Sequence, residues 1–92
     1  MRVKAIYRKN LFNKLFKKND KYVVASKLAA QVSHAVTGAG VTDPRCTLVV
    51  LPVSDKKFEE LVERHSAYVH ADSGLTLIEG GTRSAAAWVE EV

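Results

Sequence analysis

The amino-acid sequence predicts an α/β fold, which we expect to be a three-layer α/β/α sandwich with a small mixed, mainly parallel sheet of about four strands. Strand-type and helix-type patterns alternate along the chain in the order strand, helix, strand, helix, strand. Helices that connect strands in this way usually place the strands parallel. The 92 residues are enough for one domain, residues 1–92, with a small core.

The first strand is predicted at residues 2–8, where polar and apolar side chains alternate. Residues 10–26 follow as an extended basic loop, within which a short amphipathic helix is expected because large apolar side chains recur four residues apart. These side chains are Leu11, Phe12, Leu15 and Phe16.

The next helix is expected to begin after Ser26, a good N-cap, and to end at Gly38. At about 100° per residue, Lys27, Gln31 and His34 form one polar stripe on this helix. Lys27 would lie in the first turn, where the positive end of the helix dipole repels it, so an anionic partner such as a phosphate would stabilise it there. The alternative is a lysine that reaches into solvent and a histidine satisfied by a neighbour.

The second half of the chain contains a nearly continuous apolar run, which predicts a central strand at 46–53. A second helix is expected at 55–65, capped by Ser54. The remaining predictions are a short strand at 68–69, a strand at 75–78, and a final strand around 87–89, with 85–92 left open between strand and helix.

The net charge of +4 conceals a strong asymmetry along the chain. Residues 1–27 carry nine basic side chains and one acidic side chain, a balance of +8, whereas the remaining residues carry five basic and nine acidic side chains, a balance of −4. A cationic patch on an acidic body is typical of proteins that bind a phosphate-rich partner. An anionic membrane surface and an ordinary solvated surface are the alternatives.

Composition also bears on the cellular compartment of the protein and on whether it crosses a membrane. A single cysteine excludes an intrachain disulfide framework, and no apolar run is long enough to cross a bilayer. We therefore expect a cytoplasmic protein without stable membrane insertion. A metal site built from His65, His70 and Asp72 is not expected, because their spacing is nonspecific.

Residues 27–35 read Lys-Leu-Ala-Ala-Gln-Val-Ser-His-Ala. This run resembles the signature helix of the type 2 peptidyl-tRNA hydrolases, whose pattern is Lys-aliphatic-Ala-Ala-Gln-(Cys/Val)-(Ser/Ala)-His-Ala, at all nine positions. Residues 5–11 resemble the first strand of that family, which runs into Arg-x-Asp-Leu, with Asn10 in place of the aspartate. On this resemblance the chain is a diverged, shortened member of the family.

The resemblance implies hydrolysis of the ester between a peptide, or other N-blocked aminoacyl group, and tRNA, with no cofactor and no metal. Lys27 would hold phosphate and stabilise the oxyanion, and His34 would orient water or act as the base. Gln31 would donate to a carbonyl or join the helix to a loop. The candidate substrate-binding residues are Arg8, Gln31, Arg83, Ser84, Lys17 and Lys18.

The second half of the family carries Leu-Ile-x-Asp-Ala-Gly-Arg-Thr after a strand, which we align with Leu77-Ile78 and the residues that follow. Gly80 then stands where the functional aspartate would be, Thr82 is a candidate catalytic hydroxyl, and Arg83-Ser84 correspond to the Arg-Thr pair. Loss of the carboxylate would remove the group that fixes the protonation of the lysine and histidine. The alternative function is therefore a catalytically inactive member that binds tRNA, other RNA or a nucleotide. A homodimer is also an option, because a small sheet with an exposed edge strand invites pairing.

Overall fold

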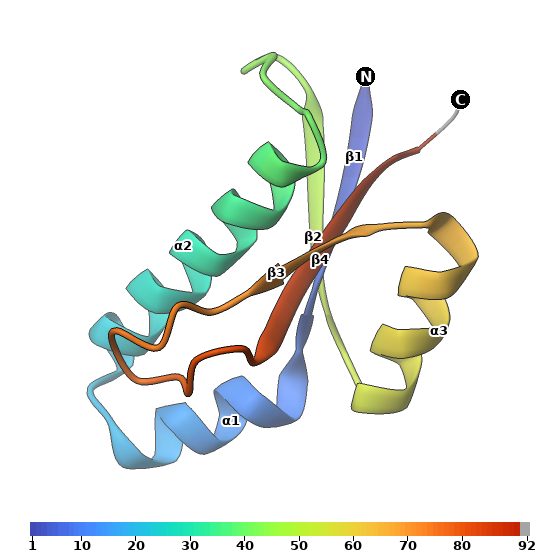
Figure 1. Cartoon of the computed structure of the whole chain (residues 1–92). Coiled ribbons are helices and arrows are strands. Elements are labelled where there is room, and N and C mark those ends of the chain that lie inside the picture. Colours follow the sequence, from blue (N-terminus) through green and yellow to red (C-terminus); the bar gives the residue numbers. More distant parts are fainter. Residues whose placement is uncertain (91–92) are drawn as a thin grey trace.

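Seven helices and strands make up residues 1–90, the part of the chain that the computed structural model describes (Figure 1). In chain order they are β1 (Arg2–Arg8), α1 (Lys9–Lys18), α2 (Lys21–Gly38), β2 (Thr47–Val53), α3 (Asp55–His65), β3 (Tyr68–Ala71) and β4 (Arg83–Glu90). The predicted α/β class is confirmed. Residues 91–92, the end of the segment left open between strand and helix, lie outside the described residues.

The four strands form one mixed sheet in the order β2-β1-β4-β3. β1 and β2 pair in parallel, whereas β4 is antiparallel to both of its neighbours, β1 and β3. Three strands therefore run in one direction, but the reversed strand β4 lies between two of them, so only one of the three pairings is parallel. The predicted mixed sheet of about four strands is confirmed, and the expectation of mainly parallel pairing is wrong.

Helices pack against both faces of the sheet (Figure 1). Ala5 and Ile6 are neighbours on β1 and point to opposite faces. Ala5 packs with Val32 of α2, whereas Ile6 packs with Phe58 of α3. On β4 the side chains Ala85, Ala86 and Ala87 are all fully buried, since the strand is covered on both faces.

Several predicted elements are confirmed because local sequence signals set them. β1 spans the predicted residues 2–8, and α3 spans the predicted residues 55–65. The hydroxyl of Ser54 accepts a hydrogen bond from the N–H of Lys57 at 3.1 Å, as its role as the N-cap requires. The short strand at 68–69 is part of β3, and the final strand around 87–89 is part of β4.

The basic segment 10–26 is helical throughout most of its length rather than an extended loop. α1 is the expected amphipathic helix, with Phe12 buried against Val24 of α2. α2 begins at Lys21, six residues before the predicted start, because the carboxylate of Asp20 accepts hydrogen bonds from the N–H groups of Tyr22 (2.9 Å) and Val23 (3.2 Å).

Ser26 is therefore not the N-cap. It lies in the second turn of α2, where its hydroxyl donates to the carbonyl oxygen of Tyr22 at 2.8 Å. Lys27 also lies beyond the first turn, so repulsion by the helix dipole, which falls off within that turn, does not explain its role. The predicted end of the helix at Gly38 is confirmed.

The apolar strand β2 is an edge strand and not the predicted central strand. Pro52 fits this place, because proline has no N–H to donate to a neighbouring strand and is therefore confined to edge strands. Leu48 and Val50 on β2 remain 45% and 41% exposed, so burial within this chain does not account for the apolar character of the strand.

Residues 75–78 form part of a loop between β3 and β4 rather than the predicted strand. Leu77 has φ +54° and Gly74 has φ +84°, values that no β-strand adopts. A Cβ on Gly74 would lie 2.9 Å from the backbone of Gly80, so the two ends of this loop touch. Ile78 is 4% exposed and anchors the loop against α1 and α2.

Replacing the N-cap of α2 tests where this helix begins. We expect Asp20→Ala to lower the free energy of unfolding by about 1 kcal/mol, because two N–H groups lose their acceptor. Ser26→Ala is the matched control and should change it by less than about 0.5 kcal/mol, as is usual for an exposed position. Urea denaturation measures both, and a larger loss in Ser26→Ala than in Asp20→Ala would contradict the assignment.

Candidate functional site

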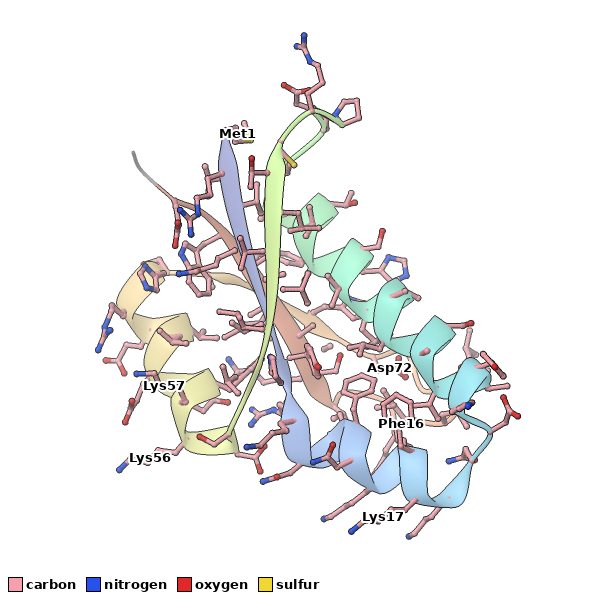
Figure 2. All side chains as sticks on the ribbon, turned by 180° about the vertical axis from the view of Figure 1, so that it is seen from behind. Met1, Phe16, Lys17, Lys56, Lys57 and Asp72 are labelled. Atoms are coloured by element: carbon pink, nitrogen blue, oxygen red, sulfur yellow. The ribbon has the colours of Figure 1, made fainter. Side chains whose placement is uncertain are left out.

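A buried ion pair joins α2 to the first residue after β3. The Nζ atom of Lys27 lies 2.7 Å from Oδ1 of Asp72, and the side chains are 13% and 1% exposed. Oδ2 of the same carboxylate accepts a hydrogen bond from the N–H of Gly74 at 2.7 Å. Figure 2 shows Asp72 beside α2, on the face of the sheet that this helix covers. Both oxygens of a buried carboxylate are therefore satisfied.

The environment keeps this carboxylate ionised. Burial by itself would raise the pKa of Asp72, but the hydrogen bonds from Lys27 and Gly74 and the charge of Lys27 outweigh it and hold the pKa below the usual 3.8. Because the folded-state pKa is depressed, the pair stabilises the fold above about pH 4, and the contribution is lost as the pH falls through the folded-state pKa. Near neutral pH the site holds a carboxylate facing an ammonium group.

The expectation that no carboxylate accompanies Lys27 is thus wrong. Asp72-Ser73-Gly74-Leu75-Thr76 fits the family motif Asp-Ala-Gly-Arg-Thr at Asp, Gly and Thr, and it directly follows β3. Leu77 and Ile78, which were predicted from the sequence to lie in a strand, lie in a loop. The signal that could have found Asp72 was its place after the short strand at 68–71.

Gln31 and Ser84 connect α2 to β4. Gln31 is 2% exposed, and its side-chain oxygen accepts a hydrogen bond from the hydroxyl of Ser84, which is fully buried. The amide of Gln31 also helps to lower the pKa of Asp72. These two candidate substrate-binding residues are enclosed, so their role in this structure is to hold α2 and Asp72 in place.

His34 lies exposed on α2 and stacks on His70 of β3, with the ring centroids 4.9 Å apart and the planes 28° apart. Burial, followed by the charges of His34 and Lys27, lowers the pKa of His70 below 6.5, while Asp72 opposes the shift. His70 is therefore neutral near pH 7 and carries a ring nitrogen that can accept a proton. From the sequence, His70 was considered only as one ligand of a metal site that was not expected.

The three residues considered for a metal do not meet. His65 lies on α3, stacked against Trp88 with the ring centroids 4.3 Å apart and the planes 5° apart, on the opposite face of the sheet from α2. Within residues 1–90 no group of three or more metal-binding side chains forms.

A second group of candidates lines an open pocket of about 470 Å³ beneath α1. Thr82 lies here, and neither Lys27 nor His34 lines this pocket. The pocket is lined by Arg8, Asn10, Leu11, Lys14, Asp55, Gly81, Thr82 and Arg83.

The two arginines of this pocket are already bound to acidic side chains. Nε of Arg8 donates to the carbonyl oxygen of Arg83 at 2.6 Å, its Nη atoms pair with Asp55 (3.3 Å) and Glu59, and its guanidinium lies 4.2 Å from the centre of the Phe58 ring. Arg83 pairs with Glu59 at 2.8 Å. Burial would raise the pKa of Glu59, but its bonds to the two arginines lower it. A phosphate would have to compete with these carboxylates.

The lysines at the start of the chain form a separate basic surface. Five of them lie exposed on α1 and the first turn of α2, and none lies within 4 Å of a carboxylate in the part of the chain that the structure describes. They are Lys9, Lys14, Lys17, Lys18 and Lys21. Figure 2 shows Phe16 on the side of α1 that faces the body and Lys17 on the opposite side. Lys27 is six residues beyond Lys21, a rise of about 9 Å along α2.

Comparison of the chain with protein-family models, with curated proteins and with solved structures finds no match. Among residues 1–90, no helix combines the length and the apolar character needed to cross a membrane. What the site can do is therefore inferred from its own residues and geometry.

Neutralising both members of the buried ion pair should be tolerated better than neutralising one. We expect Lys27→Met or Asp72→Asn alone to lower the free energy of unfolding by about 3 kcal/mol, because each leaves a buried charge without its partner. The double variant keeps an acceptor for Gly74 and should lie within about 1 kcal/mol of the unmodified protein. Urea denaturation at pH 7 measures the cycle. Additive losses in the double variant would show that the two side chains do not stabilise each other.

Proposed function

We propose that this protein is a type 2 peptidyl-tRNA hydrolase-like enzyme that cleaves the ester between a peptide, or other N-blocked aminoacyl group, and tRNA. The observation that carries the proposal is the 2.7 Å pair between Lys27 and Asp72. It joins the helix that resembles the family signature to a segment that fits the family's aspartate motif, although the two are far apart in the sequence. The helices on both faces of the sheet also support the three-layer α/β/α sandwich that the resemblance implies.

Lys27 is suited to bind the substrate carbonyl. Its ammonium group has three N–H donors, and Asp72 accepts from one of them. The other donors can stabilise the negative oxygen that develops when the carbonyl carbon is attacked, and the low exposure of the pair strengthens that interaction. The 2.7 Å contact with Asp72 holds the Lys27 ammonium group in place.

The histidine pair is suited to activate water. A neutral imidazole of His34 or His70 accepts a proton from water as the water oxygen attacks the ester carbon. The tetrahedral intermediate then collapses, the bond to the ribose oxygen breaks, and the imidazolium returns the proton to that oxygen. The products are the free carboxylic acid and tRNA with its terminal hydroxyl restored.

The basic surface of α1 and the start of α2 is suited to hold the tRNA backbone. Its lysines are exposed and lack carboxylate partners in the described residues, so they release counterions when they bind phosphates. Lys21, at the end of this surface, precedes Lys27 by six residues, a rise of about 9 Å along α2.

A non-catalytic member of the same fold, which binds tRNA, other RNA or a nucleotide, is the second candidate. It is favoured by one departure from the family motif, because Leu75 stands at the arginine position.

Hydrolysis is tested by the release of an N-acetylated amino acid from charged tRNA. We expect release by the unmodified protein and a loss of about 100-fold or more in the Lys27→Met, Asp72→Asn double variant, because that variant removes the donor to the oxyanion. Lys56→Met on α3 removes the same charge far from the site and should retain the activity. No release by the unmodified protein, with tRNA still bound, would favour the non-catalytic candidate, and full activity of the double variant would exclude the assigned role of Lys27.

Binding of tRNA is tested by two matched pairs of lysines, Lys17 with Lys18 on α1 and Lys56 with Lys57 on α3. Figure 2 labels Lys17, Lys56 and Lys57. Replacing the first pair by alanine should weaken binding and reduce the slope of log K against log salt by about 1.5, since two phosphate contacts are lost. Replacing the second pair removes the same charge and should leave the slope unchanged. An equal effect of both pairs would show that binding follows net charge and not the α1 surface.

A further inference from the structure

The outer edge of the sheet at β2 carries no charged side chain that would oppose pairing with another strand. All seven residues of β2, Thr-Leu-Val-Val-Leu-Pro-Val, are uncharged, and Leu48, Val50 and Leu51 are 45%, 41% and 40% exposed. Soluble proteins commonly place lysines or other charges on such an edge because it is a template for another strand. On β2 only Pro52 interrupts the row of donors.

The backbone of β2 offers hydrogen-bonding groups on its outer side. The N–H of Thr47 donates to the carbonyl oxygen of Met1 at 2.9 Å, so Thr47 faces β1. Backbone groups alternate along a strand, and therefore Leu48, Val50 and Pro52 direct their backbone groups away from the sheet. The N–H groups of Leu48 and Val50 are the outward donors of this strand, since proline has none.

An apolar groove runs beside this edge, between β2 and α2. Its volume is about 480 Å³, and no charged residue lines it. Leu48 and Val50 form one wall, and Ala29, Val32 and Val36 of α2 form the other. The groove and the open strand edge share Leu48 and Val50, so they form one continuous surface, which we call the β2 edge surface.

We propose that the β2 edge surface is the interface of a homodimer, in which β2 pairs antiparallel with β2 of a second copy about a two-fold axis. With Val50 opposite Val50 of the partner copy, Leu48 lies opposite Pro52, and each outward N–H finds a carbonyl acceptor. The sheets of the two copies then become one, and each α2 covers the groove beside the other. A two-fold interface must be complementary to itself, and this surface meets that condition because it is apolar and uncharged.

Charge and size favour a second copy as the occupant. Each chain carries a net charge of +4, and two copies that meet through an uncharged surface keep their lysines apart. β2 extends over about 23 Å and α2 over about 27 Å. A strip of this length that includes both elements covers roughly 500 Å² on each copy before its corrugation is counted, or about 1,000 Å² in total, which reaches the lower limit for a specific interface. Pairing would also remove the exposed edge of a small sheet.

The molar mass in solution tests this proposal independently of any activity. Size-exclusion chromatography with light scattering should give twice the chain mass of 10.1 kDa for the unmodified protein. Leu48→Lys or Val50→Lys should each reduce it to a single chain mass, because the substitution places like charges near the two-fold axis. Leu75→Lys is the matched control, since Leu75 is 84% exposed on the 72–82 loop, and it should remain dimeric.

Amide hydrogen exchange distinguishes this interface from any other dimer. The N–H groups of Leu48 and Val50 should exchange slowly in the unmodified protein, and the N–H of Leu48 should exchange at least tenfold faster in the Val50→Lys variant. A circular dichroism spectrum that matches the unmodified protein shows that the variant is folded. A monomer at all concentrations, a dimer that persists in both lysine variants, or fast exchange at both amides of a wild-type dimer would each overturn the proposal.

Discussion

The structure around the candidate site depends on one buried carboxylate, that of Asp72. A carboxylate with 1% exposure is stable only if its oxygens are bonded, and the partners come from two directions, Lys27 on α2 and the N–H of Gly74 in the following loop. The same residue fixes the loop through its backbone, because its N–H donates to Thr82 at 2.9 Å and its carbonyl accepts from Gly81 at 2.8 Å. One residue therefore positions the lysine, closes the 72–82 loop and sets where β4 begins.

The rest of the fold makes room for this arrangement. β4 carries three consecutive alanines between two helix-covered faces, so α2 can approach the sheet closely enough for Gln31 to bond Ser84. Ile78 anchors the 72–82 loop by packing against Phe12 of α1 and Val24 of α2. The proposed reacting groups thus stand on a helix and a strand that packing makes rigid, whereas the proposed tRNA-binding lysines stand on the outer surface of α1.

The sequence could predict those features that local signals determine. The alternation in residues 2–8, the Ser54 cap and the apolar spacing of α1 each depend on neighbours in the chain, and these elements are confirmed. The predicted start of α2 is wrong because Asp20 and Ser26 are both good N-cap residues. Starting the helix at Asp20 includes Val24 in it, and Val24 is buried in the core, which the local sequence does not reveal. The edge position of β2 and the contact between Lys27 and Asp72 depend on which strands become neighbours, and no local pattern encodes that. Of the candidate site, the stripe of Lys27, Gln31 and His34 was predictable, whereas the position after a short strand was the only signal for Asp72, and its contact with Lys27 and the stacking of His70 had none.

The stack of His65 on Trp88 has a practical consequence. Trp88 is the only tryptophan of the chain, and its indole lies flat against a ring supplied by the last residue of α3. Its emission therefore reports whether α3 is docked on the sheet. The protein carries its own optical probe on the face opposite the proposed catalytic groups, so folding and docking can be followed there without a label and without disturbing them.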